Sequence, residues 1–128
     1  MDITEKANSQ RVEIHEEILR NIDGRIKELY GERKKLKISR AAGLGSLVVG
    51  VLAGAGSLYN FVEGLNNPDY IQAVTGALAV IPSAITAAIG GIIYHGAEKF
   101  IQEKDKALLE LEGERKLEMG LLEGARRL

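Results

Sequence analysis

The residues that could take part in catalysis or metal binding are few and lie far apart along the chain. There is no cysteine, and the two histidines are His15 and His95. Because a structural zinc site needs four clustered nitrogen or sulfur ligands, this pair does not indicate one. No nucleophile, base and orienting group occur together in a recognisable pattern. We therefore predict that the protein is not an enzyme, and we expect neither a metal nor a cofactor.

Two glycine-rich stretches have the composition of a phosphate-binding loop. They are Gly43-Leu44-Gly45 and Gly54-Ala55-Gly56. A P-loop also requires a preceding strand and a lysine at a fixed spacing, and both are missing here. Close packing between helices explains these glycines better.

Small residues recur every four positions in two apolar stretches, which is the most specific pattern in the sequence. Such spacing lets helix backbones approach closely in lipid, where van der Waals and Cα–H···O contacts favour association. The face could pack hairpins against one another, around a pore, or it could pack the two helices of a single hairpin. The predicted helix-packing residues are Ala42, Ser46, Gly50 and Gly54, with Ala79, Ser83, Ala87 and Gly91.

Two acidic residues, Glu63 and Asp69, lie between the apolar stretches. They could form an acidic ring at the mouth of an oligomeric pore, or they could simply be solvated in a turn. The runs 41–59 and 73–94 contain no Asp, Glu, Lys, Arg or His, which argues against a proton-coupled transporter or a voltage sensor. A passive pore lined by hydroxyl groups remains open, and its candidate residues are Ser46, Ser57, Thr75, Ser83 and Thr86.

The elements that carry these residues are indicated by the distribution of charge. The 17 basic and 18 acidic residues nearly balance, so nucleic acid is not an expected partner. No charged residue occurs in 41–62 or in 70–97. Each of these apolar runs is long enough to cross the hydrocarbon core of a bilayer, about 30 Å thick. We predict an all-α protein in which a transmembrane helical hairpin is flanked by charged N- and C-terminal helices.

The N-terminal segment, 1–40, is predicted to be a charged coiled-coil helix, helical over Glu5–Ser39. Its apolar residues recur in steps of three and four, interrupted by His15 and Arg33. The histidine could respond to pH or only set the register, and the arginine could pair with a glutamate of a partner helix. The predicted coiled-coil seam consists of Val12, Leu19, Ile22, Ile26, Leu29 and Leu36.

The remaining segments are the two-span hairpin, 41–94, and a C-terminal charged helix, 95–128. Asn66, Asn67 and Pro68 favour a turn, which we place at 60–71. Pro82 lies inside the second span and is expected to kink it. Glycines beyond residue 112 weaken the prediction of helix there, so the tail is expected to be helical only when packed.

Lysine and arginine flank the outer ends of both apolar runs, whereas the connecting turn has neither. The positive-inside rule then places both termini in the cytoplasm. The alternative is a soluble helical protein, which would need an oligomer to bury both runs.

The arrangement of coiled coil, two-span hairpin and coiled coil is similar in outline to mitochondrial calcium uniporter subunits and to phage holins. The uniporter pore entry is marked by a tryptophan before an aspartate, and this signature is absent because residues 63–69 include Asp69 but no tryptophan. The sequence therefore predicts a small membrane protein that self-associates in the bilayer, as a pore-forming or membrane-perturbing oligomer of holin, channel or phage-injection type. The alternatives are a structural subunit of a membrane-associated assembly (a virion, filament or scaffold) and an accessory subunit that binds a larger protein through its coiled-coil helices.

Overall fold

The protein consists of two long helices, as a computed structural model describing residues 2–127 shows. Helix α1 spans Ile3–Asn66 and helix α2 spans Tyr70–Arg127. Residues 2–127 contain no strand. The all-α prediction is confirmed, and the two helices form a hairpin.

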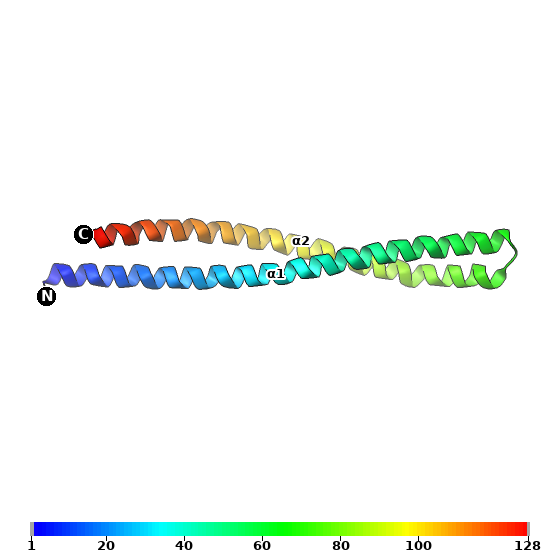
Figure 1. Ribbon diagram of the computed structural model, residues 1–128, viewed down its shortest axis with the longest axis horizontal. Coiled ribbons are helices and arrows are strands. Elements are labelled where there is room, and N and C mark those ends of the chain that lie inside the picture. Colours follow the sequence, from blue (N-terminus) through cyan, green and yellow to red (C-terminus); the bar gives the residue numbers. More distant parts are fainter. Residues whose placement is uncertain (1, 128) are drawn as a thin grey trace. The chain divides into compact units, whose positions relative to one another are not determined.

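The hairpin divides into two compact units, and each helix contributes to both. The charged unit comprises Met1–Lys34 with Ile101–Leu128, and the apolar unit comprises Lys35–Phe100. Within each unit α1 and α2 lie side by side and run antiparallel (Figure 1).

The connection between the helices is much shorter than the predicted turn at 60–71. Helix α1 continues to Asn66, because Gly64 packs against the backbone of α2 and holds the last turn in place. Pro68 has no N–H and disfavours helical geometry at the residue before it, so the chain turns there. The Asp69 N–H then donates to the carbonyl of Gly64 at 2.9 Å.

The C-terminal tail is helical as far as Arg127, well beyond Glu112. Leu122 is buried in the charged unit, which shows that this part of α2 packs against α1. The tail therefore has the packing partner that its glycines require. Neither Gly113 nor Gly120 is part of that contact, since a Cβ at either position would have no neighbour within 4 Å.

In the charged unit the buried side chains are aliphatic. They are Ile22 and Leu29 on α1 and Ile101, Leu108 and Leu122 on α2. Each pair of neighbours on one helix is separated by seven residues or a multiple of seven. This spacing keeps a single stripe of each helix on the other, as in helices that wind around each other.

In the apolar unit the buried residues are very small. Its buried residues are Gly43, Gly50 and Gly64 on α1, and Ala73, Gly76, Gly90 and Ala97 on α2. Helix α2 remains continuous through Pro82, which is exposed. The exposed position leaves room for the ring outside the interface between the helices.

Candidate functional site: the glycine-packed apolar unit

The helices of the apolar unit touch backbone to backbone at glycine. A Cβ added at Gly43 would lie 2.7 Å from the Tyr94 nitrogen and 2.8 Å from the Gly90 oxygen. At Gly50 it would collide with the backbone nitrogen of Ala87. No side chain can occupy these positions without separating the helices.

Similar contacts occur nearer the turn. A Cβ at Gly64 would lie 2.5 Å from the Ala73 nitrogen, and one at Gly76 would lie 2.6 Å from the Phe61 nitrogen. Close approach is therefore maintained along the apolar unit rather than at a single crossing point.

The contact residues recur in series with a spacing of seven positions. On α1 they are Gly43, Gly50, Ser57 and Gly64, and on α2 they form two such series, one of Gly76, Ser83, Gly90 and Ala97 and one of Ala73, Ala87 and Tyr94. Two antiparallel helices that stay in contact over many turns need a spacing near 3.5 residues, which gives a repeat of seven. A four-residue spacing drifts around the helix and leaves the interface after a few turns.

The predicted helix-packing residues accordingly fall in different environments. Gly50 is buried in the interface, whereas Ala42 is exposed beside the buried Gly43. Gly54 and Gly91 are at the edge, since a Cβ at Gly54 would lie 3.6 Å from the Ser83 Cβ and one at Gly91 would lie 3.8 Å from the Leu47 Cδ1. The other predicted residues, Ser46, Ala79, Ser83 and Ala87, are partly exposed, and the backbones of Ser46, Ser83 and Ala87 lie against glycines of the opposite helix.

Sequence reasoning missed Gly43, Gly64, Gly76 and Gly90 as contact residues. The signal was present, because Gly43 and Gly50 continue the seven-residue series of Ile22 and Leu29 in the N-terminal segment. Reading the apolar run separately from the charged helix hid this continuity.

Large aliphatic side chains point away from the interface of the apolar unit. Leu52 is 67 % exposed and Ile92 is 73 % exposed. Others on this surface are Val48, Val49, Val51, Leu58, Val62, Val74, Leu78, Ile81, Ile85 and Ile89. The unit thus has small residues inside and large apolar residues outside, the reverse of a soluble protein's core.

Three hydroxyl groups in the apolar unit bond within their own helices. The hydroxyl of Ser57 donates to the carbonyl of Ala53, and that of Ser83 donates to the carbonyl of Ala79, both at 2.8 Å. Thr86 donates to the carbonyl of Pro82 at 2.8 Å. These donors need no water or partner to be satisfied.

The two acids near the turn also have local partners. The Asp69 Oδ1 accepts a hydrogen bond of 3.1 Å from the Gln72 N–H, three residues into α2, which is the geometry of an N-cap. The Glu63 Oε2 accepts a bond of 3.2 Å from the Gln72 side-chain amide. Both carboxylates therefore stabilise the closed end of the hairpin. A shallow depression beside them is lined by Ser57, Asn60, Gln72, Thr75, Gly76 and Ala79.

In the charged unit, the predicted seam residues face α2 to different degrees. Ile22 and Leu29 are buried, whereas Val12, Leu19, Ile26 and Leu36 are partly exposed, the last of them in the apolar unit. His15 lies in the same seven-residue series, and its Nδ1 is 2.8 Å from the Glu118 Oε2 of α2. The polar side chain in this series thus has a partner from the opposite helix.

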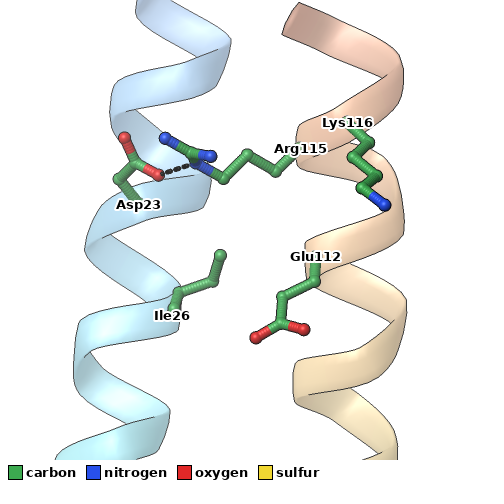
Figure 2. A pocket seen from close by; sticks show the side chains of 5 residues that line it. All are labelled: Asp23, Ile26, Glu112, Arg115 and Lys116. Atoms are coloured by element: carbon green, nitrogen blue, oxygen red, sulfur yellow. Dashed lines mark hydrogen bonds and ion pairs between the residues drawn. The ribbon is translucent and has the colours of Figure 1, made fainter.

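Ion pairs between the helices flank this stripe. Arg115 Nε donates to Asp23 Oδ1 at 2.7 Å, beside Ile26 (Figure 2). Further pairs join Arg126 to Glu16 at 2.8 Å, Lys104 to Glu32 at 2.6 Å and Arg33 to Asp105 at 2.6 Å. The Arg33 Nε–H does not point at its carboxylate, so this contact is an ion pair without an aligned hydrogen bond.

Tyr30 adds a hydrogen bond across the charged unit. Its hydroxyl donates to the Glu112 Oε1 at 3.1 Å. This hydrogen bond, together with the negative charge of Glu112, raises the pKa of the Tyr30 hydroxyl above its ordinary value of 10.0.

Among residues 2–127 no group of three or more histidine and acidic side chains is placed to hold a metal ion. Known proteins give no further guide. The chain matches no protein-family model, no curated protein and no solved structure. Its function must therefore be argued from the two surfaces that the helices present.

Proposed function

We propose that the protein is an integral membrane protein whose apolar unit spans a lipid bilayer as a closed hairpin. The observation that carries this proposal is the sorting of side chains by size. Glycine and alanine fill the contact between the helices, while leucine, isoleucine and valine cover the outside. An apolar surface of this extent is unfavourable in water but matches the acyl chains of lipid.

The low burial of the two apolar stretches distinguishes a membrane-spanning hairpin from the core of a soluble protein. Both helices contain a stretch long and apolar enough to cross a membrane, and only 17 % of each stretch is buried. The core helix of a soluble protein would be mostly buried. A soluble form of this chain would need an oligomer to cover both stretches from all sides.

The ends of the apolar unit support the predicted orientation. Lys35, Lys37 and Arg40 lie at the end where the unit opens, whereas Glu63 and Asp69 lie at the turn. By the positive-inside rule, the open end and both termini face the cytoplasm.

For the role in the membrane, we propose a structural one: a membrane-anchored subunit whose charged unit is an antiparallel coiled coil available for assembly. Within one hairpin the glycine contacts leave no space for a lumen. The hydroxyls of Ser57, Ser83 and Thr86, which could line an oligomeric pore, are bonded to their own helices. In this proposal the charged unit binds either other copies of the chain or a larger protein.

The test is reconstitution of the full chain into liposomes that contain a self-quenched dye. We expect the protein to resist extraction at alkaline pH and the dye to be retained at every protein-to-lipid ratio at which the vesicles stay intact. Extraction into the aqueous phase would overturn the membrane proposal. Dye release that rises steeply with protein concentration would instead establish the pore-forming oligomer.

A further inference from the structure

The basic residues of the protein differ in whether they have an acidic partner. In the charged unit Arg33, Lys104, Arg115 and Arg126 each form an ion pair with the opposite helix. In the apolar unit Lys35, Lys37, Arg40 and Lys99 form no ion pair with any residue in 2–127. We call these four residues the basic belt.

The belt lies at the border of the exposed apolar surface. Gly43 contacts the backbone of Tyr94, so these two residues mark one level of the unit. Lys37 lies six residues before Gly43, and Lys99 lies five residues after Tyr94, so both are roughly 7–9 Å beyond that level. The four basic side chains thus share a narrow zone next to the proposed hydrocarbon boundary.

Their positions surround the hairpin instead of forming a patch on one side. Lys35 and Lys37 are separated by two residues, about 200° around α1, so they flank its contact with α2. Lys99 belongs to α2 and is exposed on that helix, in the seven-residue series of Leu78, Ile85 and Ile92. These three residues are themselves largely exposed, and therefore face away from α1. A partner that binds from one side would meet only part of this belt.

The local charge is strongly positive. Helix α1 has no acidic residue from Lys34 to Val62, and within the apolar unit the belt zone of α2 contributes Glu98 alone. Long basic side chains can extend along apolar surface and place their charges at the level of the headgroups. Lipid phosphate groups in that layer carry negative charge that can pair with the belt, which forms no ion pair within residues 2–127.

We propose that the basic belt binds the phosphodiester headgroups of anionic phospholipids and keeps a ring of them around the hairpin. This inference rests on the proposed membrane insertion. The belt geometry selects a lipid surface over a soluble anionic protein, because only a surface that encircles the hairpin can meet all four charges.

The test measures lipid selectivity by electron spin resonance with spin-labelled lipids. The full chain is reconstituted in phosphatidylcholine containing a trace of spin-labelled phosphatidylglycerol or phosphatidylcholine. We expect the anionic lipid to be immobilised with about fivefold preference over phosphatidylcholine. This factor corresponds to the attraction of one basic residue to an anionic lipid surface. High salt should reduce that preference.

A variant with Lys35→Gln, Lys37→Gln, Arg40→Gln and Lys99→Gln should lose the preference. The matched control removes four basic residues of the charged unit that also lack ion pairs in the described chain, as Arg20→Gln, Arg25→Gln, Lys27→Gln and Lys116→Gln. It should keep the preference.

Three results would overturn the inference. They are equal immobilisation of both lipids by the unmodified chain, an unchanged preference in the belt variant, and equal loss in the control. Failure to immobilise either lipid would show that the hairpin does not enter the bilayer, which contradicts the proposed function itself.

Discussion

At the scale of the residue, the protein depends on which glycines meet the opposite backbone. Glycine costs about 1 kcal/mol relative to alanine inside a helix. At Gly50 and Gly90 that cost is offset by close contact, whereas at Gly45 and Gly56 a Cβ would meet nothing within 4 Å. Glycines that look alike in the sequence therefore have different roles.

Gly50→Ala and Gly54→Ala should have unequal effects on stability. The added methyl collides with the Ala87 backbone at position 50 but makes an ordinary 3.6 Å contact with Ser83 at position 54. We expect Gly50→Ala to destabilise the hairpin by about 2 kcal/mol, as overpacking does, and Gly54→Ala to be near neutral. Unfolding followed by circular dichroism in detergent micelles measures both.

Gly56→Ala is the control, since it adds helix propensity in open space and should stabilise slightly. Equal destabilisation at positions 50 and 54 would restore the four-residue face as the true interface.

Tyr30 should ionise at higher pH in the hairpin than in the unfolded chain. Glu112 raises the pKa of this hydroxyl, so its neutral form is favoured in the folded state. The stabilisation is fully present below the unfolded pKa, at the ordinary value of 10.0, and is lost as the pH rises through the folded pKa. The measurement is a pH titration of tyrosinate absorbance in the unmodified chain and in the Tyr30→Phe variant. The difference between the two curves gives the titration of Tyr30.

Replacing Glu112 by alanine removes the acceptor and the charge, and the Tyr30 transition should then move to lower pH. A transition that stays in place would mean that the hydrogen bond does not form in solution.

At the scale of the element, α1 carries one continuous seven-residue series that is aliphatic in the charged unit and glycine-rich in the apolar unit, whereas α2 uses two neighbouring series. In α2 one series passes from Gly76 and Gly90 to Ala97, and a neighbouring series contains Ile101 and Leu108. The sequence predicted the helices and the hairpin, because charge segregation and apolar spacing are strong local signals. The extent of the turn was wrong, because Asn60 and Glu63 look like turn residues alone yet lie in a helix that packing sustains.

Leu108→Ala and Leu109→Ala form a matched pair on α2. Leu108 is 5 % exposed and packs in the charged unit, whereas its neighbour Leu109 is 73 % exposed. We expect the first change to cost about 2–3 kcal/mol and the second less than about 0.5 kcal/mol. Thermal unfolding of the two variants measures the difference, and similar losses would show that another surface covers Leu109.

At the scale of the whole molecule, one pair of helices presents two unlike surfaces. The charged unit carries ion pairs and a polar exterior, and the apolar unit carries an aliphatic exterior over glycine contacts. Sequence alone could separate these regions. The sequence could not show that the glycines of the two helices pack against each other within one hairpin, because that depends on which residues of the two helices meet.

The central claim is that lipid covers the outer surface of a closed apolar unit. The chain lacks cysteine, so a nitroxide can be attached to single variants such as Leu52→Cys and Ile85→Cys. The measurement is collision of the nitroxide with oxygen and with a water-soluble nickel chelate in liposomes. We predict strong access for oxygen and exclusion of the nickel chelate at both positions. Access for the nickel chelate, or exclusion of both reagents by protein contact, would contradict this claim.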